Sequence, residues 1–282
     1  MVVRQTFLLF KERILNWIFN GKQIIIFLFM LMLANYALAP IGKLSVMTGQ
    51  PVQLWEPFLA AVNSVKVFPG ILLGFLVLCS DFYSLDEIKT YLISRSGKKV
   101  WYAGNVLFAL GSALFYAVEV AAVFSLRIVM YAYPQNGWSL LTRNYLRDYA
   151  KAGTSTGVIC MVSNRIYHHF TPNKALMTQL FLLAGLLFSL HLVIVITGLK
   201  RHLQIGILLV GILLLTGIAL SWVGHPLFRY HPLGNALLYV LNDEVLKSGT
   251  DYFEYLYLGG LNFLLILWGM IRVLLWKGME KT

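Results

Sequence analysis

Residues 176–199 read LMTQLFLLAGLLFSLHLVIVITGL, and this stretch decides the class of fold. It contains no Asp, Glu, Lys or Arg over 24 residues. As an α-helix it would be about 36 Å long, at about 1.5 Å per residue. That length exceeds the roughly 30 Å of hydrocarbon in a bilayer. We therefore predict a transmembrane helix at this place.

Apolar runs of similar character recur along the 282-residue chain, in which 59% of residues are hydrophobic and 12% are charged. We predict six spans, at 24–39, 58–80, 104–131, 176–199, 203–223 and 255–276. The second contains Pro69 and Gly70 and is expected to be a kinked helix. No polar stretch is long enough for a separate soluble domain. The predicted fold is all-α, one polytopic transmembrane domain covering residues 1–282.

The formal net charge of +11 is explained by membrane topology and anionic lipid rather than by nucleic-acid binding. With the N-terminus inside, the cytoplasmic segments 1–22, 82–101, 199–202 and 277–282 hold twelve Lys or Arg in 52 residues. The outer segments 41–66, 132–174 and 224–254 hold nine in 100 residues. This asymmetry predicts that both termini are cytoplasmic.

The segments outside the spans have patterns of their own. Residues 1–22 mix charged and apolar side chains without a small-residue cleavage site, which predicts an interfacial helix rather than a signal peptide. In the first long outer loop, 139–150 has helical spacing and 158–170 resumes an apolar face. In the last, the mostly apolar run 233–246 is too short to span. It fits either a re-entrant or interfacial helix pair or an outer loop packed on its neighbours.

Few polar side chains fall inside the predicted spans. Glu119 is the most informative, because a carboxylate inside a bilayer is costly and marks a pathway or a pair. It could face a substrate, pair with Arg127 or a partner helix, or make a structural interhelical hydrogen bond. Arg127 lies about 12 Å further along the same helix, too far for contact unless both side chains reach. His191 is expected to be a packed or hydrogen-bonded residue.

Motifs of the common catalytic and metal sites are missing from the sequence. There is no G-x-x-x-x-G-K-[ST], no H-E-x-x-H, no G-x-S-x-G and no C-x-x-C. The four outer histidines, His168, His169, His225 and His231, match no metal-ligand spacing. We predict no catalytic residue, no metal site and no cofactor held by this chain.

Residues 80–101 read SDFYSLDEIKTYLISRSGKKVW, a polar segment between the second and third spans. Asp86 and Glu87 favour a helix N-terminus, and Leu85, Ile88 and Leu92 fall on one helical face. The basic end of the segment has the composition of a cytoplasmic membrane anchor. A short amphipathic helix held there by two spans could transmit force between the membrane and a soluble partner. The alternative is an ordinary cytoplasmic loop.

This arrangement resembles the permease subunits of ATP-binding cassette transporters, specifically the type-2 exporter class of bacteria. The family often carries an acidic pair before Gly-Thr, an apolar helical run, a basic residue and a Gly-Lys that opens the third span. The matching positions are Asp86, Glu87, Thr90, Tyr91, Leu92, Ile93, Arg95, Gly104 and Asn105. The chain differs in having Lys89 before Thr90 and Asn105 after Gly104.

The resemblance implies a permease without its own ATPase, located in the bacterial plasma membrane. Such a subunit forms homo- or heterodimers and binds two separate ATP-binding cassette subunits, which hold ATP and Mg²⁺. The substrate would be a lipid, a polysaccharide, a drug or a peptide, moved outward. The residues implied to couple the permease to its ATPase are Asp86, Glu87, Ile88, Thr90, Tyr91, Leu92 and Arg95.

Other classes of function stay open at this point. A non-transporting membrane scaffold, sensor or immunity protein is the main alternative. An intramembrane enzyme would have to use Glu119 or His191. An ion-coupled carrier is less favoured, because two matching, broken half-repeats are not visible in the sequence.

Overall fold

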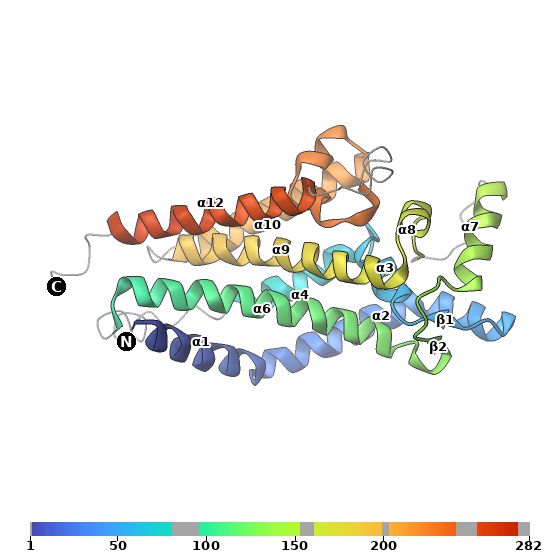
Figure 1. Ribbon diagram of the computed structural model, residues 1–282, viewed down its shortest axis with the longest axis horizontal. Helices are drawn as coiled ribbons and strands as arrows, with labels where there is room; N and C mark the ends of the chain where they lie inside the picture. Colours follow the sequence, from blue (N-terminus) through green and yellow to red (C-terminus); the bar gives the residue numbers. More distant parts are fainter. Residues whose placement is uncertain (1, 81–95, 153–160, 199–202, 241–252, 276–282) are drawn as a thin grey trace.

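The computed structural model describes residues 2–80, 96–152, 161–198, 203–240 and 253–275 (Figure 1). Within these residues, five helices are long and apolar enough to cross a membrane. They are α2 (Gly21–Thr48), α6 (Lys98–Leu126), α9 (Pro172–Gly198), α10 (Leu203–Val223) and α12 (Phe253–Leu275). The protein is therefore a polytopic helical membrane protein by length and composition of its helices.

Shorter elements complete the described chain. The α-helices are α1 (Val2–Ile18), α3 (Glu56–Val62), α4 (Phe68–Ser80), α7 (Leu140–Ala152) and α8 (Asn164–His169). The 3-10 helices are η1 (Val129–Tyr131), η2 (Pro226–Tyr230), η3 (Gly234–Ala236) and η4 (Leu238–Val240). Strands β1 (Val52–Gln53) and β2 (Ala132–Tyr133) pair in parallel, with Val52 opposite Ala132.

Helix α9 is the central helix of the bundle. It packs against α6, α10 and α12, and α6 in turn packs against α1 and α12. Of the five long helices, α9 is the most buried, whereas α10 and α12 are mostly exposed. Exposed apolar side chains on outer helices are expected where the surrounding solvent is lipid.

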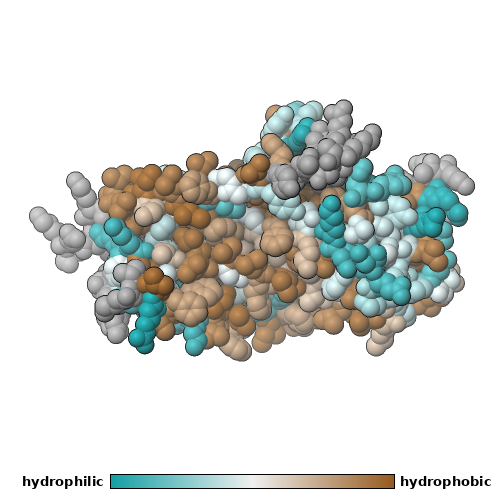
Figure 2. Space-filling view, in the orientation of Figure 1, coloured by the Kyte–Doolittle hydropathy of each residue, from teal (hydrophilic) through white to brown (hydrophobic). Residues whose placement is uncertain are grey.

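The surface is divided along the long axis of the molecule. Figure 2 shows predominantly apolar residues along most of its length, over α1, α6 and α12, and hydrophilic residues gathered at the end that carries α7 and the two strands. The start of α1 and the end of α12 lie together at the opposite end (Figure 1). An apolar band with polar residues at the ends is the surface of a membrane-spanning protein.

The second predicted span is interrupted rather than kinked. Residues 58–80 form two helices, α3 and α4, separated at Asn63–Val67, so the prediction of one kinked helix is wrong. The interruption precedes Pro69, which sits in the first turn of α4, where a missing N–H is tolerated. The 13 residues of α4 rise about 20 Å, less than the hydrocarbon thickness.

The N-terminal helix, predicted to be an interfacial helix, packs on the bundle. Helix α1 runs lengthwise beside α6 instead of lying across one end of the bundle (Figure 1). The ring of Trp17 stands edge-on to Phe108 and Phe115, with centroid distances of 6.4 and 5.6 Å. Gly104 and Gly111 leave space on α6 for the side chains of Leu9 and Phe10. The amphipathic pattern of residues 1–22 therefore reflects a face buried against another helix.

The outer segments match the predictions in part. The helix expected at 139–150 is α7, and α8 falls within the expected apolar run 158–170. The expected helix pair over 233–246 is not found in the described part of this run. Two short 3-10 helices, η3 and η4, occupy residues 234–236 and 238–240 instead. Their side chains Leu233, Ala236, Leu237 and Leu238 are buried, as a loop packed on its neighbours requires. The rest of this run lies outside the described residues.

Candidate functional site

The polar side chains singled out from the sequence lie on α6, at its C-cap and on α9: Glu119 is in α6, Arg127 caps its C-terminal end, and His191 is in α9. Glu119, which lies in the second half of α6, is half-buried. Its Oε2 accepts a hydrogen bond of 2.5 Å from Nε2 of Gln23, in the first turn of α2. Of the possibilities left open for Glu119, the described contact is an interhelical hydrogen bond.

Arg127 also finds its partner on α2 rather than on its own helix. Its Nε donates to Oδ1 of Asn35 at 2.9 Å. Gln23 and Asn35 both belong to α2, and Arg127 is the C-cap residue of α6, so two polar contacts join α2 to α6 and its C-terminal end. These hydrogen bonds join both charged side chains to α2 and not to each other.

A shallow groove runs beside the Glu119 carboxylate. It encloses about 400 Å³ between α2 and α6 and is lined by Gln23, Ile24, Phe27, Phe115, Val118, Glu119 and Ala122. Ile24 and Val118 are well exposed at its edges, so it opens to the outside of the bundle. A carboxylate beside an apolar, open groove has the composition of a helix-docking or amphipathic-ligand surface.

His191 is fully buried where α9 meets α6. Its Nδ1 lies 2.9 Å from Oγ of Ser112, and its ring stands edge-on to Phe75 and Phe108 at centroid distances of 6.0 and 5.3 Å. An imidazole in such surroundings acts as a packing residue, with the Ser112 hydroxyl as a polar partner. This arrangement agrees with the packed, hydrogen-bonded residue expected from the sequence.

The first turns of α6 contact α1 and α12. The Trp101 ring is buried, and Cζ of Arg13 on α1 lies 5.7 Å from its centroid. The Tyr102 hydroxyl donates to the carbonyl oxygen of Ile266 on α12 at 2.9 Å. Helix α6 also packs along α9. A displacement of the chain immediately before Lys98 would therefore be passed to α1, α9 and α12 together.

A buried carboxylate at the polar end of the molecule was not singled out by the sequence. Glu56, at the start of α3, is 3% exposed. Its Oε1 accepts from the backbone N–H of Ser139, and its Oε2 accepts from the hydroxyls of Ser139 and Thr142. Burial raises the pKa of this carboxyl, while the bonds from Ser139 and Thr142 oppose the shift. The available signal was Glu56-Pro57, a typical helix start.

A second polar network, which the sequence analysis did not predict, joins the segment between α3 and α4 to α9 and to residues 236 and 239. The Asn63 amide donates to Oε1 of Gln179 on α9 at 2.8 Å, and Gln179 donates to the carbonyl oxygen of Ala236 at 2.8 Å. The backbone N–H of Tyr239 donates to Asn63 at 3.3 Å. Gln179 is fully buried. Single polar residues at such distant positions carry no pattern that sequence reasoning could have paired.

The residues expected to couple the chain to an ATPase lie outside the described residues, as do the other positions from 81 to 95. In the part of the chain that the structure describes, no three His, Cys, Asp or Glu side chains are grouped closely enough to hold a metal ion. The site that can be described is therefore α6 itself, with a firmly packed first turn and two polar contacts to α2.

The fold and this site define a class, a multi-pass helical membrane protein whose third predicted span contains the charged residues Glu119 and Arg127. Comparison with known proteins adds no narrower identity, since no family model, no curated protein and no solved structure matches the chain.

Proposed function

We propose that this chain is the transmembrane permease subunit of an ATP-driven exporter of the type-2 class. It would work in the bacterial plasma membrane as a homo- or heterodimer, with separate ATP-binding cassette subunits that hold ATP and Mg²⁺. The substrate would be lipid-like, peptide or drug-like, and both termini would be cytoplasmic. ATP hydrolysis would belong to the partner, so this chain would have no catalytic residue.

One structural observation carries this proposal. The segment 80–101 runs directly into the first turn of α6, and that turn contacts α1 through Trp101 and α12 through Tyr102. A soluble partner that moved the segment would shift three packed helices along with α6, because packed interiors transmit displacement with little compression. Coupling of this kind is what an ATP-driven permease needs.

The polar contacts between α2 and α6 fit the same proposal. Two hydrogen bonds, Gln23–Glu119 and Asn35–Arg127, join α2 to α6 and to its C-cap residue. Polar pairs between membrane helices are modest in energy, roughly 0.6 kcal/mol on average. Contacts of that strength can break and re-form during a rearrangement of the bundle, which alternating access requires.

The proposal is tested by purifying the tagged chain in mild detergent from cells that contain its native neighbours. We expect an ATP-binding subunit to co-elute in about equal amount. Leu92→Asp, or Asp86→Lys with Glu87→Lys, should reduce this association while leaving membrane insertion intact.

Arg143→Glu is the matched control, because it reverses an exposed charge on α7 at the opposite, polar end of the molecule. It should co-elute with the partner as the natural chain does. Elution of the natural chain without any nucleotide-binding protein would contradict the proposal and favour a scaffold, sensor or immunity protein. Full association of the Leu92→Asp chain would exclude this segment as the docking element.

A further inference from the structure

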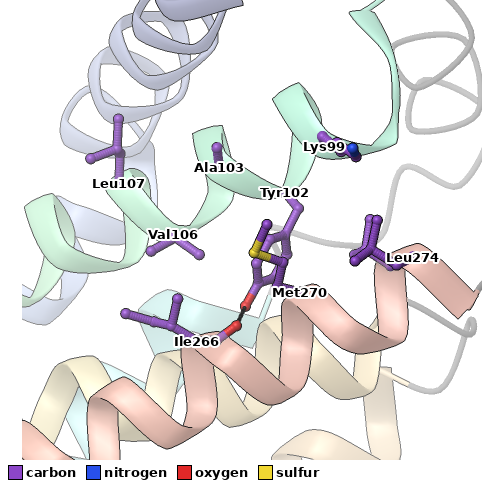
Figure 3. Close-up of a pocket in the computed structure, with 9 residues that line it drawn as sticks. Lys99, Tyr102, Ala103, Val106, Leu107, Ile266, Met270 and Leu274 are labelled. Carbon is purple, nitrogen blue, oxygen red and sulfur yellow. Dashed lines mark hydrogen bonds between the residues drawn. The ribbon is translucent and has the colours of Figure 1, made fainter.

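A second groove lies on the other side of α6, between α6 and α12 (Figure 3). It encloses about 360 Å³, and its walls are almost entirely apolar. The side chains that form it are Lys99, Tyr102, Ala103, Val106, Leu107, Ile266, Met270, Val273 and Leu274. The only charged member is Lys99, at the end of the groove where α6 begins.

A hydrogen bond joins the two helices at this groove. Tyr102 reaches across to the carbonyl oxygen of Ile266, drawn as the dashed line in Figure 3. Gly269 has no side chain where the Tyr102 hydroxyl lies, which permits this close crossing. Because the Tyr102 hydroxyl is already hydrogen-bonded to the carbonyl oxygen of Ile266, the surface of the groove away from Lys99 is apolar.

The dimensions of the groove favour a lipid chain over a protein helix. Lys99 and Leu107 are eight residues apart, or about 12 Å along the helix axis. This is close to the roughly 15 Å of hydrocarbon in one leaflet. An α-helix with its side chains is about 10 Å across, much wider than an extended hydrocarbon chain. A single acyl chain is narrow enough to enter it.

The positive charge of Lys99 at the end of the groove favours a lipid with an anionic headgroup. Lys99 is exposed, and no described residue supplies it with a counter-ion. An ammonium group at the boundary of the apolar band attracts the phosphate of an anionic lipid, and basic residues beside grooves between membrane helices bind such headgroups. A chain lying against Leu107 and Met270 would bring its phosphate to the level of Lys99.

We propose that the groove between α6 and α12 is a binding site for one anionic phospholipid. Its acyl chain lies along Ala103, Leu107 and Met270, and its phosphate is bound by Lys99. The lipid then covers the side of α6 opposite to the Glu119 contact with α2. This inference depends on the membrane location of the helices and not on the proposed transport function.

The test uses the purified full chain in nanodiscs of phosphatidylcholine that contain a little phosphatidylglycerol with a photoactivatable group midway along one acyl chain. After irradiation and digestion, mass spectrometry should find the label on peptides from both α6 and α12. Unlabelled phosphatidylglycerol should compete better than phosphatidylcholine. Lys99→Gln should weaken this competition on the order of fivefold, the effect of about one surface charge.

Ala103→Phe should fill the groove and remove the label from both peptides. Two matched controls should behave as the natural chain, namely Lys11→Gln on the exposed side of α1 and Ala122→Phe on another face of α6. Equal competition by the two lipids, or full labelling of the Ala103→Phe chain, would overturn the proposal. Cross-linking of a second protein chain into the groove would overturn it as well.

Discussion

Glu56 shows how one side chain joins segments that are distant in the sequence. It accepts three hydrogen bonds from Ser139 and Thr142, at the start of α7, from a position 83 residues earlier in the chain. Glu56→Ala would leave a buried backbone N–H and two hydroxyls without their acceptor. We expect a loss of about 3 kcal/mol in the free energy of unfolding, measured in detergent by circular dichroism. Glu12→Ala, at an exposed position of α1, is the control and should change little.

The same residue should make stability depend on pH. Burial raises the pKa of the Glu56 carboxyl above the ordinary value for glutamate, about 4.3. The folded chain therefore holds this proton more tightly than the unfolded chain. Its stabilising contribution is complete below the ordinary pKa and is lost as pH rises through the raised pKa. Glu56→Gln, which cannot ionise, should lack this decline when unfolding is compared across pH. An identical pH profile for both chains would contradict the assigned shift.

Single residues also mark the limit of what the sequence could predict. Glu119, Arg127 and His191 stand out because polar groups inside apolar runs are rare, and all three make side-chain hydrogen bonds or ring contacts in the structure. Their partners could not be named in advance, since Gln23 and Asn35 are brought to Glu119 and Arg127 only by the packing of α2 on α6. A polar residue in an apolar run indicates that a hydrogen-bond partner is needed, but only the packing of the helices determines which residue that partner is.

Among the elements, the largest error of the sequence prediction was to expect one kinked helix where α3 and α4 are separate. A Pro-Gly pair inside an apolar run suggests a kink at the proline. In the structure, however, α3 already ends at Val62, seven residues before Pro69. Asn63 ends α3 and finds its partner on α9, so tertiary contacts determine where the helix stops. Apolar periodicity carries no information about such a contact.

This interruption leads to a prediction about Pro69. In the first turn of α4 its ring displaces no helical hydrogen bond, so Pro69→Ala should destabilise the chain by less than about 1 kcal/mol. Gln179→Leu should cost more, about 2 kcal/mol, because it removes two buried hydrogen bonds to Asn63 and Ala236. Both values are measured by unfolding in detergent. A larger effect of Pro69→Ala would support a kink at the proline instead.

The crossing of α6 and α12 gives a prediction about two helices together. A Cβ at position 269 would overlap the Tyr102 hydroxyl, so Gly269→Ala should destabilise the chain by about 1–3 kcal/mol. Tyr102→Phe removes the hydroxyl and its hydrogen bond to Ile266, at a cost of about 1 kcal/mol. The double variant should lose less than the sum of the two, because the overlap is relieved. Strict additivity of the unfolding free energies would show that the two side chains do not compete for this space.

At the scale of the whole molecule, the sequence predicts the membrane class well because hydrophobic length is a direct physical requirement. Five of the six predicted spans correspond to long apolar helices in the structure. The path of α1 could not be predicted in the same way. Its amphipathic pattern suits either a lipid interface or a helix surface, and the groove left by Gly104 and Gly111 on α6 determines the choice.

The orientation in the membrane is the last prediction. The start of α1 and the end of α12 share one end of the molecule, and α7 lies at the other (Figure 1). Because Lys and Arg are denser in the segments assigned to the inside, we expect the end with α7 to face outward. In a Cys160→Ser background, Arg143→Cys on α7 should react with a membrane-impermeant maleimide in intact cells. Glu280→Cys should react only after the cells are permeabilised. Buried Cys79 provides the unreactive background. Labelling of position 280 in intact cells, with protection of position 143, would invert the topology and place residues 80–101 beyond reach of any cytoplasmic ATPase.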